Sequence, residues 1–278
     1  MIVEFIGTPG AGKTTLVPAV IDYLQEQGIS ARTVVEAARP YAQRTLVGAA
    51  VSRLAPPSLQ RPVLWQIFYH QSLLYRIKFF AKHARLIRQV SDFQKRRPIS
   101  AEDRQHVLRW FFHLIGSYEF LKAHVRPDEA LVLDEGFIHR VVQMFASDVE
   151  EPDPAQILAY VNRLPRPDLV IFPRAPWEVC ERRIYQRGLW ERFRHKSQAE
   201  VSRYVANSHR IVNLTVDTIK SQRWTVIEVD NGRDDLAASK AELRRKLAAI
   251  PLFARETPFQ TSEVSRRILA GDSVRKSE

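Results

Sequence analysis

The stretch GTPGAGKTT at residues 7–15 has the residue types and the spacing with the clearest chemistry in the chain. It fits the pattern G-x-x-x-x-G-K-[S/T], known as the Walker A motif or P-loop. In such a loop, backbone N–H groups turn toward a β-phosphate, the lysine reaches the β- and γ-phosphate oxygens, and the next hydroxyl binds Mg²⁺. The pattern therefore predicts a site for ATP and Mg²⁺ formed by Gly7, Thr8, Pro9, Gly10, Ala11, Gly12, Lys13, Thr14 and Thr15.

A second carboxylate is expected near such a metal, at the end of a neighbouring strand. The run LVLDEG at residues 131–136 supplies it, because two acids follow an apolar stretch typical of a buried strand. Asp134 is the predicted partner of Thr14 in holding Mg²⁺. Glu135 can orient a nucleophile or support the metal, and is a candidate catalytic residue. Without the P-loop, both acids would be ordinary polar residues at the end of a strand.

An arginine-rich stretch, ERRIYQRGLWERFRHK at residues 181–196, follows a later apolar run. Charge that accumulates on a phosphoryl group during its transfer is stabilised by an arginine brought over it. Arg183 and Arg187 are four residues apart and share one face of a predicted helix. A basic helix of this kind is usually a solvated face. Its position after the fourth predicted strand favours a lid over residues 182–196, with both arginines as catalytic residues.

Glu36 stands at the end of the second predicted strand, at the edge of the sheet where ligands collect in α/β proteins. A carboxylate there can accept a proton from a hydroxyl or hydrogen-bond a sugar, and Arg39 can hold an anionic group. Polar residues are common at strand ends, so both alternatives stay open. The aromatic residues of the segment that follows are expected to fill a core, because they recur at helical spacing.

The elements that position these residues alternate between strand and helix. Strands are predicted at residues 2–6, 31–36, 130–134, 168–172 and 224–229, and helices at 13–27, 176–186, 198–221 and 234–250. Residues 41–126 are predicted to be helical, in three segments divided at Pro56–Pro57 and Arg97–Pro98. The pattern predicts an α/β three-layer P-loop NTPase fold with a five-stranded parallel sheet and a helical insertion between strands two and three. One domain is predicted over residues 1–250, followed by a tail at 251–278 with a weak helical stretch at 262–269.

The net charge of +11 favours an anionic partner, which can be a nucleotide, nucleic acid or an acidic membrane surface. No recognised nucleic-acid module is present, so nucleic acid is compatible with the sequence but not indicated. A helix at residues 62–90 combines aromatic residues with Lys78, Lys82, Arg85 and Arg88 and can lie on an acidic bilayer, although a buried helix pair is the favoured interpretation. The chain shows no signal peptide, no membrane-spanning run and one cysteine, Cys180, which predicts a cytoplasmic protein.

Several of these motifs together resemble one enzyme family. The run PDLVIFPRAPWEVCERRIYQRG at residues 167–188 resembles the fourth strand and lid helix of thymidylate kinases and the related deoxynucleoside kinases. VIEVDNG at residues 226–232 is similar to their last strand and the loop that packs on adenine, which implies that Asn231 contacts the nucleotide. Glu36 occupies the place of the general base of the deoxynucleoside kinases. The resemblance covers residues 1–36 and 126–247, and it implies a homodimer formed through the inserted helices.

The sequence departs from the family at the third strand. The family's Asp-Arg-Tyr becomes Asp134-Glu135-Gly136, and the Glu-Arg-Ser motif of the nucleoside kinases is absent ahead of Asp134. The family arginine helps to bind the phosphate of the acceptor, whereas a carboxylate at 135 would repel it. The family's Phe-Leu-Asp after the fourth strand is Phe172-Pro173-Arg174. These differences indicate an outlying member whose acceptor carries a free hydroxyl rather than a phosphate.

These motifs predict a kinase that transfers the γ-phosphoryl group of ATP to a small acceptor, which can be a nucleoside, a nucleotide, a sugar or a lipid-linked alcohol. Lys13 would hold the phosphates, and Glu36 or Glu135 would orient or deprotonate the acceptor. The alternative is a nucleotide-dependent switch or NTPase that acts on nucleic acid. The pair Asp134-Glu135 favours the alternative slightly, since many ATPases position water with such a pair.

Overall fold

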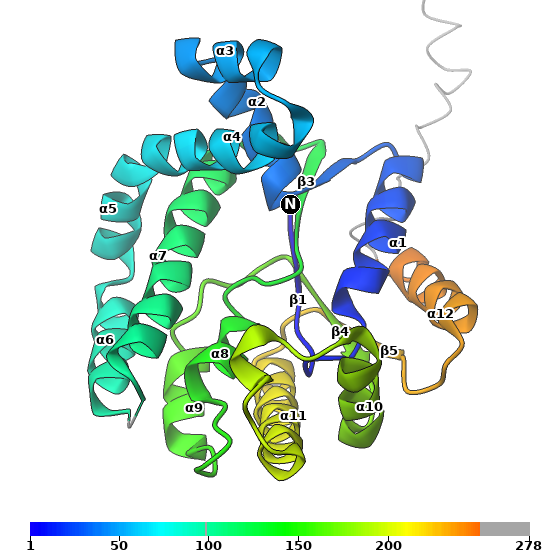
Figure 1. Ribbon diagram of the computed structural model, residues 1–278. Helices are drawn as coiled ribbons and strands as arrows, with labels where there is room; N and C mark the ends of the chain where they lie inside the picture. Colours follow the sequence, from blue (N-terminus) through cyan, green and yellow to red (C-terminus); the bar gives the residue numbers. More distant parts are fainter. Residues whose placement is uncertain (98, 251–278) are drawn as a thin grey trace, which may run out of the picture.

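The computed structural model describes residues 1–97 and 99–250, so the predicted tail lies outside the described residues. Five parallel strands form one sheet in the order β2-β3-β1-β4-β5 (Figure 1). The strands are β1 (Ile2–Phe5), β2 (Ser30–Thr33), β3 (Glu129–Leu133), β4 (Leu169–Arg174) and β5 (Val226–Asp230). The sheet confirms the predicted α/β fold, with the helical insertion between β2 and β3.

Both faces of the sheet are covered by helices, which makes three layers. One face packs on α1 (Lys13–Glu26) and α12 (Leu236–Ala248), drawn at the right of Figure 1. The other face packs on α7 (Ala101–His124), α8 (Arg140–Phe145), α9 (Pro154–Val161), α10 (Trp177–Arg187) and α11 (Gln198–Ser221). A short 3₁₀ helix, η1 (Glu191–Phe193), lies between α10 and α11. The central strand β1 is therefore buried on both sides, as its apolar sequence predicts.

The second strand ends earlier than the sequence predicted. Thr33 caps a helix at this point, because its Oγ1 accepts from the backbone N–H of Glu36 at 3.4 Å. The Glu36 carboxylate accepts in return from the Thr33 N–H at 2.9 Å, which completes a capping box. The prediction of a strand through residue 36 was wrong, because these two side chains stabilise the first turn of a helix.

Six helices follow where three segments were predicted. They are α2 (Val34–Gln43), α3 (Leu46–Leu54), α4 (Pro57–Gln71), α5 (Leu73–Lys82), α6 (Ala84–Arg96) and α7. The two breaks at prolines are confirmed. One further break occurs at Thr45, whose hydroxyl accepts from the Gly48 N–H at 2.9 Å, and two more at Ser72 and His83.

Aromatic side chains join these helices to the loop after β3. Phe79 stacks on Phe137 with ring centroids 5.2 Å apart, and the Tyr118 ring meets the same ring edge-on at 4.9 Å. Phe68 and Phe111 are also fully buried. The prediction that aromatics of the insertion fill a core is confirmed, since Trp65, Tyr75 and Phe112 also pack against it while partly buried; Phe80 and Trp110 are exposed. No helix in the described ranges is both long and apolar enough to cross a bilayer.

One acid lies inside this core. Glu4 is fully buried in β1, and its Oε2 accepts from the backbone N–H of Ile138 at 3.0 Å. A Cβ at Gly136 would lie 2.4 Å from the Glu4 carboxylate, so the loop after β3 passes directly over this side chain. Burial raises the pKa of Glu4 to about 7, although Arg140 and Lys122 oppose the shift.

This burial predicts a pH-dependent stability. An unfolded glutamate ionises near pH 4.5 and the folded one near 7, so between these values the folded state binds more protons. The free energy of unfolding should therefore fall by up to about 3 kcal/mol as the pH rises through this window. Glu4→Gln should remove this part of the slope, measured by urea unfolding at pH 4.5 and 8. The exposed Glu151→Gln is the control, and equal slopes in both variants would contradict the prediction.

Candidate active site

The loop between β1 and α1 is held between two other elements. Gly10 and Gly12 both have φ of +88°, in the left-handed region that favours glycine. A Cβ at Gly10 would lie 2.3 Å from the backbone oxygen of Cys180 in α10, and one at Gly12 would lie 2.3 Å from the amide nitrogen of Asn231 after β5. Gly10 and Gly12 are therefore required by backbone conformation and by close contact.

Hydrogen bonds of polar groups next to the loop hold it in place as well. The Asn231 amide donates to the Ala11 carbonyl at 2.7 Å, and the Asn231 backbone N–H donates to the Arg174 carbonyl at 2.8 Å. The buried Thr8 hydroxyl lies 3.3 Å from His209 Nδ1 in α11. Asn231 also lines the cavity described below, so a side chain expected at the nucleotide is at the same time a support of the loop.

Lys13 begins α1 and folds back over the loop. Its Nζ donates to the Gly7 carbonyl at 2.9 Å and to the Thr8 carbonyl at 3.4 Å. Loss of water contact around the ammonium lowers the pKa of Lys13 to about 8, and the nearby charges of Glu135 and Asp134 oppose this shift. The lysine is thus a cation held in place, with its charge only partly compensated.

Thr14 and Asp134 lie at one edge of the sheet. Thr14 is in the first turn of α1, and Asp134 directly follows β3, which pairs with β1 through Glu4 and Leu133. Burial, together with the neighbouring Glu135 charge, raises the pKa of Asp134. Within residues 1–97 and 99–250, no cluster of three or more His, Cys, Asp or Glu is placed to hold a metal. A hydroxyl and a carboxylate fit Mg²⁺ that takes its other ligands from phosphates and water.

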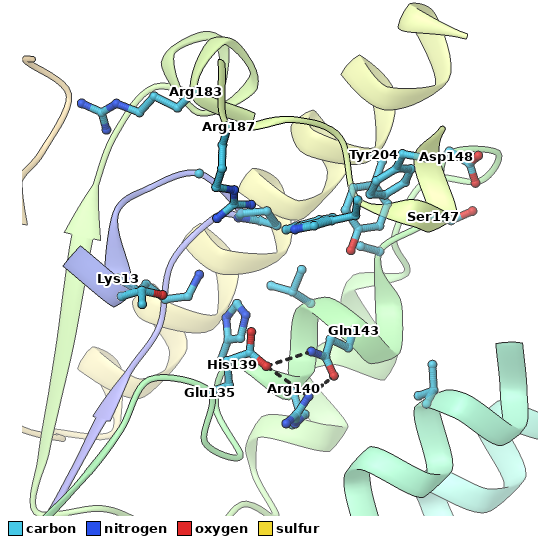
Figure 2. Close-up of a pocket in the computed structure, with 18 of the residues that line it drawn as sticks. Lys13, Glu135, His139, Arg140, Gln143, Ser147, Asp148, Arg183, Arg187 and Tyr204 are labelled. Atoms are coloured by element: carbon cyan, nitrogen blue, oxygen red, sulfur yellow. Dashed lines mark hydrogen bonds and ion pairs between the residues drawn. The ribbon is translucent and has the colours of Figure 1, made fainter. Parts of the chain in front are cut away.

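A cavity of about 1320 Å³ opens above the loop (Figure 2). Pockets for one drug-sized ligand have about 300–1,000 Å³, so this cavity has room for two ligands side by side. The P-loop forms one end. The N-terminal half of α7 forms the other end, and the loop after β3 with α8 lies between them. Of the predicted site residues, the cavity lining includes Pro9, Gly10, Gly12, Lys13, Thr14, Thr15, Glu135, Arg183, Arg187 and Asn231.

The two predicted lid arginines have different contacts. Arg187 points into the cavity in Figure 2, on the side of Lys13, whose pKa it lowers further. Arg183 points away from the cavity centre. Its guanidinium donates to the Asn231 carbonyl at 2.8 Å and to the Arg233 carbonyl at 3.0 Å, and it pairs with Asp234 at 3.2 Å. Arg183 therefore anchors the loop after β5, while Arg187 is the arginine directed at the site.

The segment after α10 closes one side of the cavity. Gly188, with φ of +95°, ends α10 and turns the chain. Lys196 then pairs with Asp148, at 2.6 Å, in the loop after α8. Asn207 of α11 donates to the Ser147 carbonyl of the same loop at 2.9 Å. The end of the arginine-rich segment is thus tied through Lys196 to the loop after α8.

Three side chains, Glu135, Arg140 and Gln143, form a connected group in the cavity, and His139 lies next to Arg140 in the chain. The Arg140 guanidinium lies 3.5 Å from the Glu135 carboxylate and also donates to the Gln143 side chain. Gln143 donates to the same carboxylate at 3.4 Å. His139 is buried beside Lys13, and its burial holds its pKa well below the usual value, so the ring is neutral. Figure 2 shows this group facing Lys13.

The α7 end of the cavity is lined by acids and aromatic rings. Glu102, Asp103, His106 and Trp110 face it. The Trp110 indole N–H donates to His106 Nε2 at 3.0 Å, and the Arg140 guanidinium lies 5.9 Å from the centroid of the Trp110 ring. Arg97, at the same end, donates to the Ala146 carbonyl at 2.9 Å.

Glu36 and Arg39 are not among the residues that line this cavity in the described part of the chain. Glu36 is exposed, and its carboxylate is held by Thr33. The sequence did not single out His139, Arg140, Gln143 and Trp110. The first three follow the DEG run at a spacing that puts them on one short helix, which is a usable signal. The position of Trp110 in the cavity lining depends on how α7 packs, and the sequence around it gives no such signal.

The sheet order and the loop geometry define an α/β protein with a P-loop fold. No family model and no curated protein matches the chain. Solved structures similar in fold include deoxyadenosine kinase from M. mycoides, in three forms. The form with products dCMP and a flexible dCDP has 13% identity and a TM-score of 0.44. The form with bound dCTP has 12% and 0.39, and the form with bound dATP has 11% and 0.41.

Each of these likenesses covers 90% of this chain and 100% of the other.

The contacts of the two arginines predict opposite effects of their removal. Arg187→Ala should lower the turnover number at least about 100-fold, because its charge faces the site, with little change in stability. Arg183→Ala should destabilise the protein by about 1–2 kcal/mol, because the loop after β5 loses its anchor. Phosphoryl-transfer rates and urea unfolding of both variants give the answer. Identical profiles for the two variants would contradict these assignments.

The lowered pKa of Lys13 predicts a proton uptake. Above pH 8 the lysine is mainly neutral, and bound phosphates should restore its charge, so binding of a non-hydrolysable ATP analogue at pH 9 should take up about one proton. Calorimetry in two buffers of different ionisation enthalpy measures this number. Lys13→Arg is the matched control, since arginine stays protonated. Equal uptake by both proteins would place the titrating group elsewhere.

Proposed function

We propose that the protein is an ATP- and Mg²⁺-dependent kinase that transfers the γ-phosphoryl group to a small acceptor with a free hydroxyl. The observation that carries the proposal is the cavity. Its lining includes the P-loop, Glu135 and the N-terminal half of α7, and its volume of about 1320 Å³ leaves room for a second molecule beside a nucleotide. An NTPase that acts only on water does not need this additional room.

The donor end supports binding of a triphosphate. Backbone N–H groups of the P-loop, the start of α1 and the Lys13 ammonium all carry positive charge toward the same place. Thr14 and Asp134 would hold Mg²⁺, which neutralises charge on the β- and γ-phosphates when bound. Arg187 would stabilise the negative charge on the transferred group. Asn231, which touches Ala11 from below, would fix the loop in its phosphate-binding form.

The acceptor end favours an uncharged hydroxyl compound over a phosphorylated one. Glu102, Asp103 and Glu135 contribute three carboxylates to this part of the lining. Two cations lie near them: Arg140, which is paired with Glu135, and Arg97, which donates to the Ala146 carbonyl. The three carboxylates outnumber these two cations, so a phosphate placed here would meet net repulsion. Trp110 and Gln143 offer a flat apolar face and an amide, which suit a nucleoside, a sugar or the head of a lipid-linked alcohol equally.

Glu135 is the residue we assign to the acceptor hydroxyl. The hydroxyl oxygen forms a bond to the γ-phosphorus, the bond from that phosphorus to the β–γ bridging oxygen breaks, and ADP leaves. The hydroxyl proton passes to the Glu135 carboxylate, which Arg140 and Gln143 hold in orientation. Glu36 is the alternative base. For that role its carboxylate would have to leave the Thr33 capping box and reach the cavity.

Transfer from γ-labelled ATP with Mg²⁺ to separate pools of nucleosides, sugars, polyprenols and nucleoside monophosphates tests the proposal. A labelled product is expected in one of the first three pools and none in the last. Lys13→Ala should abolish transfer without loss of fold, and Glu135→Gln should slow it about 100-fold or more, whereas Glu36→Gln should not. Release of free phosphate alone with every pool would instead support the NTPase alternative.

A further inference from the structure

The charge of the chain is concentrated in one segment. Residues 37–91, which include most of α2 to α6, contain no Asp or Glu and nine Lys or Arg. The rest of the chain has 33 basic and 31 acidic residues, so the segment accounts for nearly all of the net charge of +11. Individual arginines are spread along the sequence, but the excess of positive charge is not.

The same segment exposes most of the large apolar side chains found at the surface. Among the described residues, fourteen large apolar side chains are exposed, and nine of them lie between residues 46 and 80. The most exposed are Leu46 at 91%, Leu54 at 85% and Leu74 at 75%. The nine residues, which we call the α3–α5 face, are Leu46, Val47, Leu54, Leu59, Val63, Leu73, Leu74, Ile77 and Phe80.

The helices that carry this face are packed together at the outer end of the insertion. α3 packs on α2 and α4, and α4 packs on α5. The sides of α4 and α5 that face the core are already covered, since Phe68 and Phe79 are buried there. The exposed leucines therefore belong to a second, outward side of the same helices. Figure 1 draws α3 at the top and α8, α10 and α11 in the lower part of the molecule.

Cations stand among these apolar residues. Arg53 precedes Leu54 in α3, Arg61 lies between Leu59 and Val63 in α4, and Lys78 follows Ile77 in α5; all three are exposed. Two other cations of the segment are paired with acids from outside it or at its border, Lys82 with Glu119 and Arg88 with Asp92. Leucines interspersed with lysine and arginine on short helices are the composition of segments that lie in a membrane interface.

We propose that the α3–α5 face docks on the surface of an anionic lipid bilayer, with its leucines in the headgroup region and its cations on the lipid phosphates and carboxylates. The two other possible partners, a second copy of the chain and nucleic acid, would each match only the apolar residues or only the cations of the face. A symmetric contact with a second copy would bring the same cations together without a carboxylate within residues 37–91. Nucleic acid would pair with the cations but offer nothing to exposed leucines. An anionic bilayer satisfies both the charge and the apolar area.

The proposed contact is peripheral and leaves the cavity accessible. None of the nine residues of the face lines the cavity. The chemistry of the site and the docking of the face can therefore be altered separately, and the test does not depend on the proposed kinase activity.

Co-sedimentation of the full chain with vesicles tests the proposal. Vesicles of phosphatidylcholine with about one third phosphatidylglycerol should bind the protein at low salt, and pure phosphatidylcholine vesicles should not. The face variant Leu54→Gln/Leu74→Gln and the charge variant Arg53→Glu/Arg61→Glu should each bind at least about tenfold more weakly. Leu158→Gln and Arg245→Glu, exposed on α9 and α12, are the matched controls and should bind like the native chain. Unchanged thermal melting should show that all four remain folded.

Three results would overturn the proposal. The first is equal binding of face and control variants to the anionic vesicles, or no binding by any of them. The second is a dimeric mass in solution that the Leu54→Gln/Leu74→Gln variant reduces to that of a monomer, which would assign the face to a second copy. The third is tight binding of a single-stranded oligonucleotide that the arginine variant loses and the leucine variant keeps, which would assign it to nucleic acid.

Discussion

The close approach of the P-loop to its two neighbours is the constraint on which the rest of the site depends. The loop passes so near the Cys180 carbonyl and the Asn231 amide that neither Gly10 nor Gly12 has room for a side chain. Both glycines also take a positive φ that other residues adopt only at a cost. Because α10 and the end of β5 touch the loop directly, the position of the lid helix and that of the phosphate site are fixed together. Arg187, at the end of α10, is aimed at Lys13 for this reason.

A second contact of the same kind connects the middle of the sheet to the loop that carries Glu135. The loop that carries Glu135 crosses over the buried Glu4, and Gly136 is the residue at the crossing. A larger side chain at 136 would overlap the Glu4 carboxylate. The glycine that follows the Asp134-Glu135 pair is therefore explained by packing. Glu135 has no such packing role, since its side chain is about half exposed and lines the cavity.

The sequence predicted the parts that depend on local pattern. Residues 7–15 and the apolar strands are short-range signals, so the sheet, the loop and the cavity end formed by Lys13 followed directly. Glu36 shows where prediction from such local patterns fails. Its position after an apolar run predicted a strand end, but the Thr33 hydroxyl three residues earlier forms a capping box, and a helix begins instead. Arg183 and Arg187 look alike in sequence, and only the loop after β5, which folds back on Arg183, separates their contacts. His139, Arg140 and Gln143 become neighbours of Glu135 only through the short helix α8.

Two surfaces of the molecule carry opposite charge: the α7 end of the cavity is acidic, and the outer part of the insertion is basic. The acceptor end of the cavity carries carboxylates that outnumber the cations near them, while the outer insertion carries cations without a single acid in residues 37–91. A basic excess that served the nucleotide would be expected around the P-loop, yet outside the insertion the basic and acidic residues nearly balance. The proposed phosphate site would rely instead on a few fixed groups, which are backbone N–H dipoles, Lys13 and Arg187. A field from the whole protein would attract anions to every surface. In this protein the excess positive charge lies on helices that also expose leucines. The attraction is therefore directed to one face, away from the cavity. A separate anionic partner for the insertion requires this arrangement.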